Sequence, residues 1–272
     1  MKGSTKTTTA LPRVAVVVMG DLGRSRRMLA HARCLAEAGW AVDLIGFRQT
    51  DLPSFIDSRI RVRSLPSFDS VRARRPAAMF FIFAIARQFL LSLALARILL
   101  SRFDVVLVQI PPSFPALPLI LLAAKLRKSL LVIDWHNTTA AMLRLRVSDG
   151  GGLSARIVRF CGDLEIRVAR GADAHFCATA ALTGFIGERG LSGQELPDAI
   201  DFQARDAASP EPFTIVSPSS WSSDDDFELF FNALPLLDSL LAPTNLRLRF
   251  LFSGVGELRE WFESRCATLS LN

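Results

Sequence analysis

Four side chains of different chemistry, Asp134, Trp135, His136 and Asn137, follow one another directly after the apolar run 130–133. An acid, an aromatic ring, an imidazole and an amide together can bind and orient a polar ligand such as a sugar. The run before them is typical of a buried central strand, and open α/β sheets bind ligands at the carboxyl ends of strands. We therefore favour a binding site over the structural alternative, in which Asn137 caps a helix and the tryptophan and histidine belong to the core.

The turn 20–27 is a second candidate site. Gly20 and Gly23 let the backbone approach a ligand closely, and a helix that begins here offers unpaired N–H groups to an anion. The same turn carries polar and basic side chains, namely Asp21, Arg24, Ser25, Arg26 and Arg27. Positive charge on a helix-opening turn suits a phosphate or a pyrophosphate. The spacing is not GxGxxG, so a purely structural turn is an equally open interpretation.

Three further turns follow predicted strands. Pro111 and Pro112 end the apolar strand expected at 103–110, and the loop expected at 113–118 follows at the same edge of the sheet. Later in the chain, Ser220 and Trp221 lie in a polar turn after a strand. Gly254 and Gly256 then repeat the phosphate-turn pattern.

The hydrophobic pattern supplies the elements that must position these turns. Apolar runs predict strands at 13–19, 41–47, 60–62, 103–110, 130–133, 172–178, 213–217 and 246–252. Helical spacing predicts helices at 28–38, 77–100, 119–125, 155–170, 180–189 and 227–241, with a last helix ending at 272. A strand, a glycine turn, a helix and a strand open a doubly wound α/β domain. We therefore predict a domain at 13–191, a linker at 192–212 and a second domain at 213–272.

Composition describes a globular chain in a reducing compartment. Half of the 272 residues are hydrophobic, and the four cysteines lie far apart without metal-ligand spacing. With three histidines, a metal site is not expected. Residues 1–12 lack the apolar core of a signal peptide or a membrane anchor and are expected to form a loose tail.

Charge is distributed unevenly along the chain. Residues 1–130 carry 20 Lys and Arg against 7 Asp and Glu, whereas the remainder carries 12 against 19. The basic first half indicates an anionic partner. The sequence contains no recognisable nucleic-acid-binding motif. We therefore expect the partner to be an anionic membrane surface or a phosphorylated ligand, and not nucleic acid.

Residues 77–100 form the most apolar stretch, long enough to span a bilayer. Arg87, Gln88 and Arg97 interrupt it, and a charge near the centre of a span costs about 2.5–3.5 kcal/mol. A helix packed on the sheet with a membrane-facing edge is therefore favoured over a span. Farther along, we expect Glu165 at a solvated helix edge and His175 in the core.

Six segments, taken together and in this order, resemble the chitobiosyldiphosphodolichol β-mannosyltransferase family of N-glycan precursor assembly. They are 17–25, 44–47, 109–112, 132–137, 219–227 and 254–260. The resemblance implies a GT-B fold, with a complete Rossmann-like domain and the first part of a second one. It also implies transfer of mannose from GDP-mannose, with inversion and without a cofactor, onto dolichyl-diphosphate chitobiose at the cytosolic face of the endoplasmic reticulum membrane.

The resemblance also suggests roles for the candidate residues. Asp134 and His136 would meet the acceptor sugar, with Asp134 as general base for its hydroxyl. The turn 20–27 would hold the lipid pyrophosphate or shape the cleft between the two domains. Pro111, Pro112, Trp135 and Asn137 would also bind substrate. The donor would contact Ser220, Trp221, Gly254 and Gly256.

Three departures from the family pattern shape the expected activity. A family N-terminal anchor is missing, the segment 196–199 differs, and the chain ends at Asn272 within the second domain, so weak activity is expected. The alternative is a non-catalytic, membrane-associated subunit that presents lipid-linked acceptor to a separate donor-binding chain. Other glycosyltransferases of the pathway are further expected partners.

Overall fold

The computed structural model describes residues 11–53, 56, 59–65, 77–146, 152–198, 212–222, 225–244 and 246–270, with the side chains of 77–87, 145–146 and 153–154 outside the description. The chain divides into two compact units, Met1–Ile200 and Asp201–Asn272. Residues 1–10 of the expected tail lie outside the described residues.

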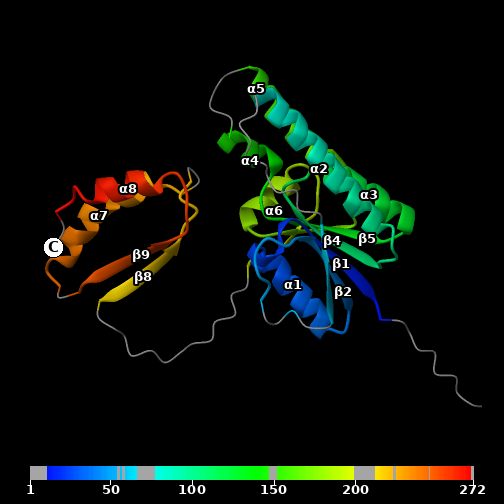
Figure 1. Ribbon diagram of the computed structural model, residues 1–272, viewed down its shortest axis with the longest axis horizontal. Helices are drawn as coiled ribbons and strands as arrows, with labels where there is room; N and C mark the ends of the chain where they lie inside the picture. Colours follow the sequence, from blue (N-terminus) through cyan, green and yellow to red (C-terminus); the bar gives the residue numbers. More distant parts are fainter. Residues whose placement is uncertain are drawn as a thin grey trace, which may run out of the picture. The chain divides into compact units, whose positions relative to one another are not determined.

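A seven-stranded parallel sheet forms the centre of the first unit (Figure 1). Its order is β3-β2-β1-β4-β5-β6-β7. The strands are β1 (Arg13–Asp21), β2 (Ala41–Phe47), β3 (Ile60–Ser64), β4 (Val105–Ile110), β5 (Leu130–Trp135), β6 (Ala174–Cys177) and β7 (Gln194–Glu195). The order reverses at β1, as in doubly wound folds, and the predicted α/β class is confirmed.

Helices cover both faces of this sheet. They are η1 (Leu22–Arg24), α1 (Arg26–Glu37), α2 (Ala77–Leu99), α3 (Ala116–Arg127), α4 (Thr139–Arg146), α5 (Leu153–Ala169) and α6 (Ala180–Gly187). Alternation along β1 separates two cores: Val14, Val16 and Val18 pack with α1, whereas Ala15 and Val17 pack with α2 and α3. Figure 1 shows α1 on the opposite side of the strands from α2, α3 and α5.

The second unit is a β-α-β-α arrangement. It comprises β8 (Phe213–Pro218), α7 (Phe227–Leu241), β9 (Leu248–Ser253) and α8 (Arg259–Cys266), with β8 and β9 parallel. Trp221, Phe227 and Phe262 form its buried centre. The Asp226 side chain accepts a hydrogen bond from the Leu229 amide and caps α7.

Several boundaries differ from the predictions. Strand β1 continues through Gly20 and Asp21, and β5 through Trp135, because parallel neighbours supply ladder partners beyond the apolar runs. Helix α3 begins at Ala116 and includes Pro118, which its first turn tolerates because the N–H there has no helical partner. Helix α8 ends at Cys266, earlier than expected.

The predicted linker also begins too early. Gln194 and Glu195 pair with Phe176 and Cys177 as strand β7, although their sequence has no apolar pattern. Asp198 then binds a side chain of α1 (below). The first unit therefore includes residues 192–198.

Helix α2 packs on the sheet through Leu91, Leu95 and Leu99, all of which are buried. Among the residues that the structure describes, no helix is long and apolar enough to cross a membrane. The side chains of 77–87, including Arg87, are not described, so the expected membrane-facing edge is tested only over the second half of the helix.

Candidate functional site

The carboxyl ends of β1, β4 and β5 lie side by side, because these strands are neighbours in the sheet. The chain order reverses between β1 and β4, which is where doubly wound folds bind ligands. Three of the predicted turns, at 20–27, 111–118 and 134–137, meet at this edge. The topology therefore brings together residues that are more than 100 positions apart.

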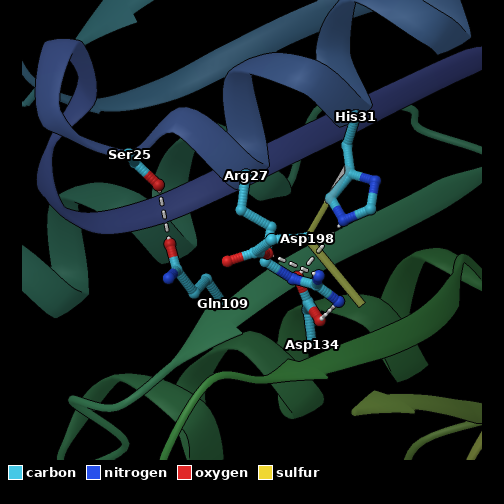
Figure 2. A network of polar contacts seen from close by, with 6 residues as sticks. All are labelled: Ser25, Arg27, His31, Gln109, Asp134 and Asp198. Carbon is cyan, nitrogen blue, oxygen red and sulfur yellow. Dashed lines mark hydrogen bonds and ion pairs between the residues drawn. The ribbon is translucent and has the colours of Figure 1, made fainter. Parts of the chain in front are cut away.

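An ion pair between Arg27 and Asp134 occupies the centre of this edge (Figure 2). Arg27 Nε and Nη2 donate to the two Asp134 carboxylate oxygens at 2.7 and 2.8 Å. Arg27 is 8% exposed and Asp134 is fully buried. The geometry is the two-pronged pairing that guanidinium and carboxylate groups favour, and it joins the start of α1 to the end of β5.

His31 lies one turn farther along α1, with Nε2 3.3 Å from Asp134 Oδ2, an ion-pair contact outside regular hydrogen-bond geometry. Burial alone raises the pKa of the Asp134 carboxyl. The nearby His31 and the hydrogen bonds and charge of Arg27 outweigh it, so the pKa of Asp134 is lowered. The carboxylate is therefore held ionised.

Two more contacts extend the network. Arg27 Nη1 donates to Asp198 Oδ1 at 2.8 Å, which attaches the segment after β7 to α1. Ser25 Oγ donates to Gln109 Oε1 at 2.8 Å, which joins the start of α1 to the end of β4. Figure 2 shows these side chains converging from separate elements. Neither Asp198 nor His31 was expected at the site, because no local pattern marks the partner of a distant arginine.

The cluster at 134–137 is divided between core and surface. Asp134 and Trp135 are fully buried, and Trp135 Nε1 donates to His175 Nδ1 at 3.2 Å. Trp135 is therefore a core residue and not the expected sugar platform, whereas the core position predicted for His175 is confirmed. His136 is exposed. The base role of Asp134 stays a prediction, and its burial and engaged oxygens weigh against it.

Asn137 is half-buried, and its Oδ1 accepts from the Thr138 amide at 2.8 Å. Thr138 Oγ1 in turn accepts from the Ala141 amide at 3.2 Å and caps α4. The helix cap is therefore Thr138, one residue later than the structural alternative placed it. Substrate contacts of Asn137 stay a prediction.

The turn after β1 is built mainly by its own contacts. Asp21 accepts from the Gln49 amide and from the Thr50 amide and hydroxyl, at 3.0, 3.2 and 2.7 Å. A Cβ on Gly23 would lie 2.6 Å from the Asp51 carbonyl oxygen, so only glycine fits there. Asp21 thus ties two loops together, and its contact with substrate stays a prediction.

The basic residues of this turn differ in access. Arg24 and Arg26 are exposed, at the N-terminal end of α1. Arg27 is committed to two carboxylates, so its expected contact with a pyrophosphate is not available in this arrangement. Ser25 and Gly20 are partly accessible. An anion at this turn would therefore meet Arg24 and Arg26.

Glu165 of α5 forms hydrogen bonds with the two loops that flank the site, one carrying Ser113 and the other leading to Thr139. Its carboxylate accepts from the Ser113 hydroxyl, from the Thr139 hydroxyl at 2.6 Å and from the Thr139 amide at 3.0 Å. Burial raises the pKa of Glu165, and these hydrogen bonds offset only part of the effect. The solvated position predicted for Glu165 is wrong: it is 1% exposed.

The loops held by Glu165 carry other predicted site residues. Pro111 is half-buried and Pro112 is exposed, two and one positions before Ser113. His136 lies three positions before Thr139. One feature of the sequence could have indicated that Glu165 is buried. Glu165 shares a helical face with the buried Val158 and Ala169, seven and four positions away.

In the second unit, the predicted donor turns pack on each other. A Cβ on Gly254 would lie 2.0 Å from the Ser219 carbonyl oxygen, and one on Gly256 would lie 2.2 Å from that of Ser220. Trp221 is 3% exposed and stacks on Phe227 with ring centroids 4.6 Å apart, so it is a core residue and not an exposed ligand platform. Donor binding by Ser220, Gly254 and Gly256 stays a prediction.

Solved structures of similar fold define the fold class. An alpha,alpha-trehalose-phosphate synthase (UDP-forming) from Burkholderia vietnamiensis aligns with a TM-score of 0.54 at 11% identity, over 95% of this chain and 68% of that one. A UDP-glucosyltransferase from Polygonum tinctorium aligns with a TM-score of 0.51 at 12% identity, over 95% and 70%. The fold is that of the GT-B glycosyltransferases.

Residues 23–196 match the glycosyl transferase 4-like domain family, and the chain belongs to that family. It is similar to the chitobiosyldiphosphodolichol beta-mannosyltransferases of Eremothecium gossypii, at 28% identity over 91% of this chain and 58% of the relative, and of Yarrowia lipolytica, at 30% over 95% and 60%. The chain spans about three fifths of the length of these relatives. The resemblance seen in the sequence motifs is confirmed.

Proposed function

We propose that this chain takes part in the transfer of mannose from GDP-mannose to dolichyl-diphosphate-linked chitobiose, with inversion at the anomeric carbon. The observation that carries the proposal is the similarity to relatives from Eremothecium gossypii, Debaryomyces hansenii and Yarrowia lipolytica, all named for the β-mannosyl transfer, over 91–95% of this chain. The proposed acceptor is a lipid, so we place the reaction at a membrane, and the resemblance to these relatives suggests the cytosolic face of the endoplasmic reticulum.

The reaction needs a base on the acceptor side. The attacking hydroxyl of the chitobiose forms a bond to the mannose anomeric carbon as the bond from that carbon to the GDP oxygen breaks, and the hydroxyl proton passes to the base. His136 supports this role better than Asp134. Its imidazole is exposed directly after β5, at the edge where ligands bind, whereas both Asp134 oxygens are occupied by Arg27.

Asp134 then acts through Arg27. The pair holds the N-terminal turn of α1 against the end of β5, and Ser25 joins that turn to Gln109 of β4. With α1 fixed, the exposed Arg24 and Arg26 stand where an acceptor pyrophosphate would find positive charge beside a helix N-terminus. Asp134 is thus a positioning residue in this proposal.

The test is transfer of radiolabelled mannose from GDP-mannose to a synthetic lipid-diphosphate chitobiose by the purified chain. A lipid-linked trisaccharide that a β-mannosidase cleaves supports the proposal. Transfer from UDP-glucose in its place would refute the donor assignment.

A second arm measures acceptor binding without donor. Binding of the lipid-linked chitobiose without turnover, followed by turnover when a donor-binding chain is added, would favour the non-catalytic alternative. Replacing Arg24 and Arg26 by Gln should weaken acceptor binding in either case. Failure to bind the acceptor, together with failure to transfer mannose, would contradict both functions.

A further inference from the structure

Helix α2 is apolar on two faces, and the sheet uses only one of them. Leu91, Leu95 and Leu99, spaced by four residues, are buried against the strands. Leu93 and Leu100, on another face of the helix, are 42% and 47% exposed. Packing of the core therefore does not account for the apolar character of this second face.

A shallow apolar groove joins this face of α2 to α3. It has a volume of about 490 Å³, and the residues that line it are Leu93, Ala94, Ala96, Arg97, Leu100, Leu119, Leu122, Ala123 and Leu126. Leu122 and Leu126, on α3, are 55% and 65% exposed. The two helices lie side by side (Figure 1). Exposed leucines that line a common groove indicate an interaction surface, unlike exposed leucines scattered singly.

The charges around this groove identify its partner. Residues 88–130 contain five Lys and Arg and one acidic residue, Asp104, whose carboxylate accepts from the Arg13 amide. Arg97 lines the groove itself, and Lys125, Arg127 and Lys128 are exposed at the end of α3. A second copy of the chain would bring these cations against each other. An anionic surface would neutralise them.

We propose that the α2–α3 groove docks on an anionic lipid bilayer. Leu93, Leu100, Leu122 and Leu126 enter the boundary between headgroups and acyl chains, and the cations contact lipid phosphates and carboxylates. The surface is formed by side chains outside the candidate site, so a lipid-linked acceptor could be bound while the groove rests on the membrane. The inference goes beyond the proposed function and does not depend on it.

Co-sedimentation of the purified chain with vesicles tests the proposal. The probes are vesicles of phosphatidylcholine with 30% phosphatidylserine and vesicles of phosphatidylcholine alone, at low and at high salt, with no acceptor lipid present. We expect binding to the anionic vesicles, weakened by salt and by omission of phosphatidylserine. Because neither sugar nor acceptor is present, this result is independent of transferase activity.

Matched variants locate the surface. Leu122→Gln with Leu126→Gln is expected to lower the partition coefficient at least about tenfold, and Lys125→Gln or Lys128→Gln about fivefold each. The control is Leu236→Gln with Leu240→Gln on α7, where the side chains are more exposed than those of Leu122 and Leu126, at 67% and 72%, and binding should not change.

Three results would overturn the proposal. They are no binding of the wild-type chain to anionic vesicles, equal binding by the groove variant and the wild type, and a dimer in sedimentation that the Leu122→Gln and Leu126→Gln changes dissociate without altering vesicle binding. The last result would identify a second copy as the occupant. Mannose transfer in detergent would survive any of the three, which separates this test from that of the proposed function.

Discussion

Arg27 and Asp134, separated by 107 positions in the chain, form a buried two-pronged ion pair at the switch point of the sheet. The pair is the point at which α1, β5 and the segment carrying Asp198 are joined. Its burial has an energetic consequence: each partner is tolerated in the core only because the other neutralises it.

Replacing Asp134 by Asn should therefore destabilise the fold as well as impair transfer. The change leaves the Arg27 guanidinium buried without its main counter-ion, and loss of one partner of a buried pair costs about 3–5 kcal/mol. The midpoint of urea unfolding measures the effect. Asp198→Asn is the control, because that side chain is 55% exposed and its pair with Arg27 should contribute less than about 1 kcal/mol. Equal midpoints for Asp134→Asn and wild type would contradict the role assigned to the pair.

Glu165 should make stability depend on pH with a defined sign. Its pKa is raised in the folded chain, so the folded state binds a proton more readily than the unfolded state. Stability from this group is present below the ordinary pKa of 4.5 and is lost as the pH rises through the raised value. The advantage of wild type over Glu165→Gln in urea unfolding should accordingly shrink between pH 4 and pH 8. An advantage that grew over this range would show that the carboxylate is stabilised as the anion.

Gly23→Ala should destabilise the turn after β1, because the added Cβ would lie 2.2 Å from Thr50 Oγ1 and 2.6 Å from the backbone oxygen of Asp51. Overpacking of this kind costs about 1–3 kcal/mol. Gly20→Ala is the matched control, with its nearest contact at an ordinary 3.7 Å from Val18 Cγ1. Thermal unfolding of both variants measures the difference in stability. An equal loss of stability in the two variants would mean that the loop carrying Thr50 moves to accommodate the added methyl group.

His136→Ala should lower the rate of mannose transfer without loss of stability. The side chain is exposed, and removal of a general base typically costs about 100- to 10,000-fold in rate. Turnover is measured at saturating donor and acceptor, and urea unfolding confirms that the fold is kept. Activity within a few-fold of wild type would return the base role to Asp134 or to a residue outside this edge.

The fold class could be predicted from local pattern because its strands are continuous apolar runs. The apolar run Val14–Val18 predicts a buried strand, and in the structure it is a strand buried on both faces of a parallel sheet. Strand β7 could not be found, since Gln194 and Glu195 are exposed and are held only by pairing with β6. Local propensity does not report a pairing between distant segments.

The sequence by itself determined that the residue types for sugar and phosphate chemistry follow the strands of a doubly wound sheet, because burial imposes the apolar runs and turns follow them. Only the tertiary structure decided what each residue does. Arg27 and Asp134 neutralise each other, Trp135 enters the core, Glu165 is buried between two loops, and His136 stays exposed. The physical reason is that charge, burial and access are set by neighbours in space, and for Arg27 and Glu165 those neighbours are 26 or more positions away.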